Sequence, residues 1–146
     1  MNVKPEIGIG KLIFGFKESE VKDIYGNPDE IKKDTESENR IIWVYNKEKI
    51  RLTFYESEDR RLGYIETSNR NLSLNDFLII DSNIEFVKNK FAEKIVNGWK
   101  KEEYHSFTTY FNEIFWITLH VEYEEVTNLE IGVPFINDDE YKWPNK

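Results

Sequence analysis

The chain has 146 residues, 39% of them hydrophobic and 15% aromatic, with a net charge of −8 and an isoelectric point near 4.9. This apolar content is enough for a packed core and excludes wholesale disorder, while the acidic surface repels phosphate backbones and disfavours nucleic acid as a partner. The absence of cysteine excludes disulfides, thiolate metal sites and a cysteine nucleophile. No secretory signal begins the sequence and no stretch approaches roughly 18 consecutive apolar residues, so we expect a cytoplasmic protein without a membrane segment.

The first predicted helix is short. Val21, Ile24 and Tyr25 lie at positions i, i+3 and i+4 and form one apolar stripe. Gly26 suits the left-handed residue that follows a helix, and Pro28 prevents the helix from resuming. Because so short a helix is unstable alone, we expect it to cover a sheet.

Strands are predicted around this helix. Residues 3–16 are expected to form an edge strand or an extended lead-in, and the polar residues 29–39 a surface loop. Residues 40–45 are rich in aromatic and β-branched side chains, and residues 50–55 alternate between apolar and polar side chains. Residues 62–68 are expected to form a third strand of the same antiparallel meander.

The second half of the chain shows the same order of elements. An amphipathic helix is predicted over residues 84–95, with Ser82 and Glu85 at capping-box spacing and a stop at Asn97 and Gly98. Three strands are expected after it, at residues 104–111, 114–123 and 128–133.

The repeated order predicts the fold class. We expect one domain over residues 1–146, built from pseudo-repeats at residues 7–68 and 73–135 and ending in an acidic tail at residues 136–146. The predicted class is α+β: two tandem helix-β-β-β units form an antiparallel sheet of about six strands, with both helices packed on one face.

The first half resembles two known families. The residues that carry the resemblance are Gly15, Val21, Tyr25, Gly26 and Pro28, then Trp43, Tyr45 and residues 50–54. This pattern is similar to small outer-membrane-assembly lipoproteins of the SmpA/OmlA type and to each repeat of the β-lactamase inhibitor protein family, which implies a helix-plus-meander shape. By type, a small, acidic protein without cysteine also resembles the bacterial immunity proteins that neutralise polymorphic or contact-dependent growth-inhibition toxins.

No catalytic or metal-binding pattern is present in the sequence. His105 and His120 are the two histidines, and neither has the spacing of a zinc motif. Neighbouring carboxylates such as Glu124 and Glu125 are expected in solvated turns. We therefore expect no enzyme, no metal and no cofactor.

Acidic side chains beside aromatic ones suit a binding surface for a basic protein. Trp43, Trp99 and Trp116 are expected in the core, whereas Tyr55, Tyr123 and Trp143 are expected to be exposed. The predicted partner-binding residues are Tyr55, Glu56, Glu58, Asp59, Glu122, Tyr123, Glu124, Glu125, Asp138, Asp139, Glu140 and Trp143. The leading hypothesis is a monomeric or weakly dimeric immunity protein that occludes a toxin domain, with a basic, nuclease-like domain as the expected target. The alternative is a small-molecule-binding or housekeeping α+β module without a toxin partner.

Overall fold

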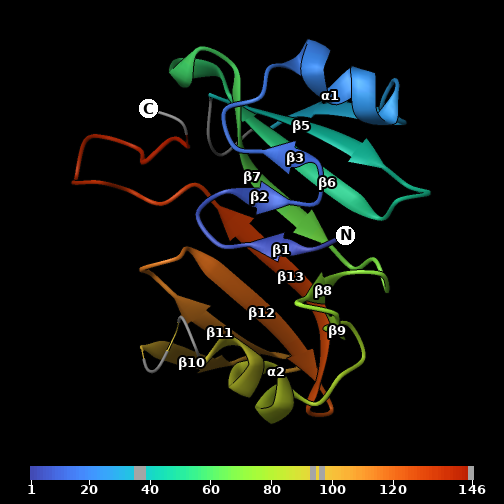
Figure 1. Cartoon of the computed structure of the whole chain (residues 1–146), viewed down its shortest axis with the longest axis vertical. Helices are drawn as coiled ribbons and strands as arrows, with labels where there is room; N and C mark the ends of the chain where they lie inside the picture. Colours follow the sequence, from blue (N-terminus) through green and yellow to red (C-terminus); the bar gives the residue numbers. More distant parts are fainter. Residues whose placement is uncertain (35–38, 93–94, 96–97, 145–146) are drawn as a thin grey trace.

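A computed structural model of the chain describes residues 1–34, 39–92, 95 and 98–144, and it is built mainly from β-strands (Figure 1). Eight strands form one antiparallel sheet in the order β10-β11-β12-β13-β7-β6-β5-β4. Their bounds are β4 (Glu30–Lys33), β5 (Arg40–Tyr45), β6 (Ile50–Tyr55), β7 (Arg61–Thr67), β10 (Trp99–Glu103), β11 (Thr108–Asn112), β12 (Ile117–Glu122) and β13 (Glu125–Gly132). Two four-stranded meanders thus meet edge to edge where β7 pairs with β13, with Ile65 opposite Ile131.

The predicted α+β class with about six strands is wrong. Within the described residues, two helices account for a small part of the structure, and the large sheet has two more strands than expected. The added strands, β4 and β10, are its two edges, and all four residues of β4 are exposed. A charged edge strand lacks the alternation of apolar and polar residues that marks a half-buried strand, so β4 was predicted as a loop. Lysine at the edge of a sheet discourages pairing with another molecule.

Two further small sheets complete the β-structure of the described residues. The segment expected to be an edge strand or lead-in forms a three-stranded sheet of β1 (Val3–Lys4), β2 (Gly8–Ile9) and β3 (Leu12–Ile13). A two-stranded sheet, β8 (Ser73–Leu74) and β9 (Phe77–Leu78), lies in the polar connection between the meanders.

The helices are α1 (Glu18–Tyr25) and α2 (Ile84–Phe91). Helix α1 has its predicted position and is followed by Gly26 at φ 76°, a left-handed value that glycine adopts without steric cost. Helix α2 is capped by Asn83, whose side chain accepts a hydrogen bond from the Glu85 amide at 2.9 Å. It ends at Phe91, earlier than expected, and the predicted stop at Asn97 lies outside the described residues.

One face of the large sheet is covered and the other is open. Val21 of α1, Val87 of α2 and Leu12 of the three-stranded sheet are buried in one core with Leu52 and Leu119 of the large sheet. The helices and the three-stranded sheet therefore lie on the same face (Figure 1). Because successive side chains of a strand point to opposite faces, the polar residues between the core positions lie on the open face.

Candidate partner-binding site

A hydrogen-bonded network crosses the centre of the open face, where the two meanders meet. The Glu130 carboxylate accepts a hydrogen bond from the Tyr64 hydroxyl at 2.7 Å and a second one from Nε2 of His120. On the same face, the Asn128 side-chain amide donates to the Glu66 carboxylate at 2.9 Å. Residues from β7, β12 and β13 are therefore joined by side chains as well as by the sheet.

The network sets the charges of its members. Burial acts to raise the pKa of Glu130, but the hydrogen bonds from His120 and Tyr64 outweigh it and hold that pKa below its usual value. The hydrogen bond to Glu130 raises the pKa of His120 above 6.5, against the opposing effect of burial. Burial, together with the nearby Glu130 charge, raises the pKa of Tyr64 and keeps its hydroxyl protonated.

Two hollows lie beside this network. One, of about 340 Å³, is lined among others by Arg40, Tyr64, Trp116 and Glu130; the other, of about 480 Å³, includes Arg51, Glu66 and Asn128. We call the open-face residues that line these hollows or form the network the seam surface: Arg40, Arg51, Thr53, Tyr64, Glu66, Trp116, His120, Asn128 and Glu130. Tyrosine, tryptophan and arginine are the residue types that most often dominate binding energy at protein interfaces.

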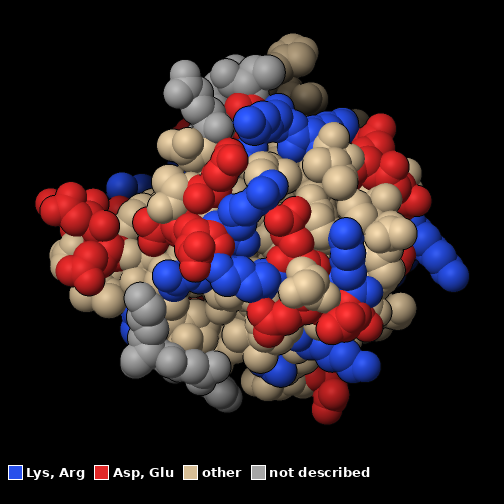
Figure 2. All heavy atoms as spheres, turned by 90° about the horizontal axis from the view of Figure 1, so that it is seen from above, with Lys and Arg blue, Asp and Glu red and all other residues tan. Residues whose placement is uncertain are grey.

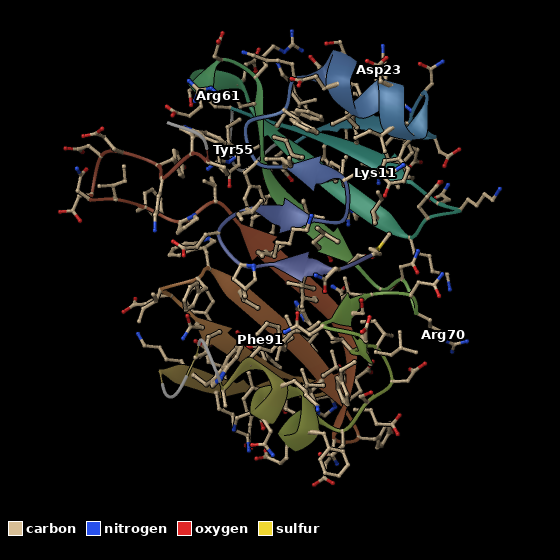
Figure 3. All side chains as sticks on the ribbon, in the orientation of Figure 1. Lys11, Asp23, Tyr55, Arg61, Arg70 and Phe91 are labelled. Carbon is tan, nitrogen blue, oxygen red and sulfur yellow. The ribbon has the colours of Figure 1, made fainter. Side chains whose placement is uncertain are left out.

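The C-terminal tail folds against one end of the open face. Its backbone forms a hairpin in which the Lys142 amide donates to the Pro134 carbonyl at 2.7 Å. The Tyr141 ring lies 5.2 Å from that of Tyr55, and Trp143 lies under Arg61, whose guanidinium carbon is 4.8 Å from the indole centroid. Figure 3 shows Tyr55 and Arg61 at this end of the large sheet. Tyr55 and Trp143 are only 5% and 6% exposed, so the prediction that they are exposed is wrong.

The first predicted acidic cluster lies at the turn between β6 and β7, in the 3-10 helix η1 (Glu56–Glu58) and the following Asp59. The Asp59 carboxylate lies 2.7 Å from the Lys17 ammonium, and Glu56 lies 4.0 Å from Lys33. Figure 2 shows this end of the molecule, with blue and red side chains interspersed over most of it. The charge of this cluster is therefore partly balanced within the chain.

The second predicted cluster, Asp138, Asp139 and Glu140, lies at the exposed tip of the tail hairpin. The Asn137 side chain accepts hydrogen bonds from the Asp139 and Glu140 amides at 2.9 and 3.0 Å and shapes the turn. The tail projects to the left in Figure 1, and carboxylates gather at the same side in Figure 2.

The third predicted cluster, Glu122 to Glu125, lies at the opposite end of the sheet from η1 (Figure 1). Tyr123 and Glu124 form a two-residue hairpin loop with φ values of 51° and 66°, a conformation that favours Asn-Gly. Holding two such residues there costs roughly 1 kcal/mol each, and Tyr123 is 99% exposed. The three clusters therefore do not form one continuous surface.

A groove of about 430 Å³ adjoins the third cluster, and we call it the end groove. Its lining includes Glu122, Tyr123 and Glu124 from the loop, Glu85 from α2, Lys101 from β10, and the aromatic residues Tyr104, Phe107 and Tyr110. Tyr104 and Phe107, in the turn between β10 and β11, were not predicted as site residues. Their rings stack at 4.7 Å, a contact that residue spacing alone does not show.

The seam surface was also missed by reasoning from sequence. Because successive side chains of a strand point to opposite faces, His120 follows buried Leu119 onto the open face, and this alternation is the signal for the seam surface that the sequence carries. Glu130 reaches His120 and Tyr64 only because β13 pairs with both β12 and β7, in a register that brings the three side chains together. No group of three histidine or carboxylate residues in the described part of the chain could hold a metal ion.

Comparisons with known proteins are limited to the fold. No protein-family model matches the chain, and no curated protein sequence matches it. A crystal structure of an extracellular protein containing a SCP domain from Bacillus anthracis str. Ames is similar, with a TM-score of 0.55 and 13% identity. The match covers 81% of this chain and 43% of that one, so this chain spans less than half of its length. No helix in the described ranges is long and apolar enough to cross a membrane. The resemblance to that structure shows a shared fold and nothing about activity.

Proposed function

We propose that the chain is a cytoplasmic immunity-type protein that binds a toxin domain through the seam surface and acts by occlusion, without catalysis. The observation that carries this proposal is the open face of the large sheet, where Arg40, Tyr64 and Trp116 line a hollow beside the His120–Glu130 pair. Both helices lie on the other face, and on the open face the tail covers one end, where Tyr141 contacts Arg40 and Phe135 contacts Trp116.

The size of the open face fits a stable protein interface. Eight strands about 4.8 Å apart and about six residues long present a face of roughly 650 Å². A standard interface buries roughly 800 Å² on each partner. Side chains at the rim of the sheet add to this area. The open face is therefore large enough to cover the active site of a small toxin domain.

The charge of the chain favours a basic partner. The net charge of −8 accelerates the approach of a positively charged domain. A nuclease-like toxin must attract phosphates, so its active site is positively charged and complementary to this chain. The proposed inhibitor is a monomer or a weak dimer and needs neither metal nor cofactor.

The test is co-expression and pull-down with the toxin domain encoded by the neighbouring reading frame. The expected result is a salt-sensitive complex that protects the host. Glu66→Lys, on the seam surface, should weaken the complex by at least about tenfold. Asp23→Lys makes the same charge change on α1, on the covered side of the sheet, and should weaken it less than about twofold. Absence of any complex, or equal weakening by both variants, would contradict the proposal.

A second candidate function has one observation in its favour. The hollows of about 340 and 480 Å³ fall in the size range of small-molecule sites. A defined small molecule that raises the melting temperature of the wild type, but not that of Tyr64→Ala, would support a ligand-binding module instead.

A further inference from the structure

We propose that the end groove is a docking site for an arginine side chain from a basic protein segment, held between aromatic rings and the carboxylates of Glu122 and Glu124. This inference rests on the proposed function, because the basic segment is taken to belong to the occluded partner. It adds a second contact region at one end of the sheet, which adjoins the seam surface where the Phe107 ring lies 5.8 Å from that of His120.

The electrostatics of the end groove favour a cation. Three carboxylates line it, from Glu85, Glu122 and Glu124, against one ammonium, from Lys101. The Lys101 ammonium lies 3.2 Å from the Glu103 carboxylate, and Lys88 lies 3.7 Å from Glu85. Within the described part of the chain, neither Glu122 nor Glu124 has an ion-pair partner. These two carboxylates therefore provide the charge that a cation would meet.

The aromatic side chains of the groove favour arginine in particular. The Tyr104 ring stacks on that of Phe107 at 4.7 Å and is 50% exposed, so it keeps an accessible face in the groove that Glu122 and Glu124 also line. Lys101 and Lys88 lie over the ring of Tyr110, at 5.9 and 5.1 Å from its centroid. Among the residues described, no lysine or arginine lies over Tyr104, Phe107 or Tyr123, although the His120 imidazole lies 5.8 Å from the Phe107 ring. A guanidinium group stacks on such rings and binds carboxylates with the same planar group.

The backbone holds Tyr123 at the mouth of the groove. The Ile84 amide, at the start of α2, donates to the Glu124 carbonyl at 2.9 Å and fixes the hairpin loop against the helix. Tyr123 is 99% exposed at a left-handed position that disfavours tyrosine. A large side chain kept in this conformation without contacts inside the chain is suited to contact a partner.

The experiment uses the full chain and a fluorescently labelled hexa-arginine peptide, with binding measured by anisotropy and mapped by amide chemical shifts. We expect the shifts to change at residues 104–107 and 122–124. Glu122→Gln with Glu124→Gln should weaken binding by at least about fivefold. The matched control, Asp138→Asn with Asp139→Asn, removes two charges from the tail and should weaken binding less than about twofold.

A third variant separates folding from binding. Tyr123→Asn suits the left-handed position better than tyrosine, so the melting temperature should be unchanged or higher, while peptide binding falls about three- to fivefold. Equal weakening by the two charge-neutralised variants, or shift changes confined to other regions, would overturn the inference. The proposed function is tested separately. If the chain fails to bind the peptide but still protects against the toxin, the inference about the end groove is wrong and the occlusion proposal is unaffected.

Discussion

Replacing Glu130 with glutamine should destabilise the protein most where His120 is protonated. Glu130 is only partly exposed and accepts hydrogen bonds from Tyr64 and His120. A hydrogen bond to a charged group contributes about 1.5–3 kcal/mol. Glutamine keeps one acceptor oxygen for Tyr64, but its amide nitrogen cannot accept from a protonated His120. We therefore expect a loss of about 2 kcal/mol in the free energy of unfolding near pH 6, which lowers the melting temperature by about 4–8 °C.

The loss in the free energy of unfolding caused by Glu130→Gln should become smaller as the pH rises. The folded-state pKa of His120 is raised, so its contribution is complete below pH 6.5 and is lost as the pH rises through the raised value. The folded-state pKa of Glu130 is lowered, so its contribution is present above pH 4.5 and is lost as the pH falls through the lowered value. Once the pH exceeds the raised pKa of His120, its imidazole is neutral and can accept a hydrogen bond from the glutamine amide, so the cost of Glu130→Gln at pH 9 should fall below about 1 kcal/mol.

Urea unfolding monitored by tryptophan fluorescence at pH 6 and pH 9 measures this difference. Glu66→Gln is the matched control, because Glu66 is a carboxylate on the same face that accepts from the neutral amide of Asn128. We expect the control to cost less than about 1 kcal/mol at both pH values. If Glu130→Gln costs the same at both pH values, the ion pair between Glu130 and His120 does not stabilise the fold and the reasoning fails.

Three further substitutions test the packing around the site. Gly63→Ala places a Cβ 2.3 Å from the ring of buried Tyr55 and should lower the free energy of unfolding in urea by about 1–3 kcal/mol. An unchanged free energy of unfolding would show that the Tyr55 ring can shift to make room for the methyl group. Trp143→Ala should cost about 3 kcal/mol and make the tail sensitive to limited proteolysis, whereas an unchanged digestion pattern would contradict its role as the tail's anchor. Thr67→Val should cost about 1–2 kcal/mol, because the buried hydroxyl donates to the Lys49 carbonyl at 2.9 Å; an unchanged denaturation midpoint would refute that estimate.

The local sequence pattern was sufficient to predict the helices and strands whose residues contact the core directly. Helix α1 has both a stripe of apolar residues and a Gly26 stop, and β6 alternates apolar and polar residues, so each carries its own signal. Tyr123 was predicted to be exposed beside carboxylates and is 99% exposed, although the strand that was expected to include it ends at Glu122.

Tertiary structure decided the edges of the sheet and the burial of the tail. Strand β4 has the sequence Glu-Ile-Lys-Lys and is a strand only because β5 offers it backbone hydrogen-bonding groups. Tyr55 and Trp143 were predicted to be exposed, since a tyrosine on the polar side of β6 and a tryptophan in a polar tail have no visible partner in sequence. They bury each other's surfaces, with Tyr141 packed against both rings.

For the candidate sites too, some features follow from the sequence and others only from the tertiary structure. Composition alone determined that the protein is acidic, free of cysteine and able to form a core. The seam surface exists because β13 pairs with β7 and β12 in one register, which places Glu130 between Tyr64 and His120, 66 and 10 residues away along the chain. The periodicity of a strand predicts the face on which a side chain lies. The side chains that it contacts there depend on strand order and register, which are fixed only when the whole sheet assembles.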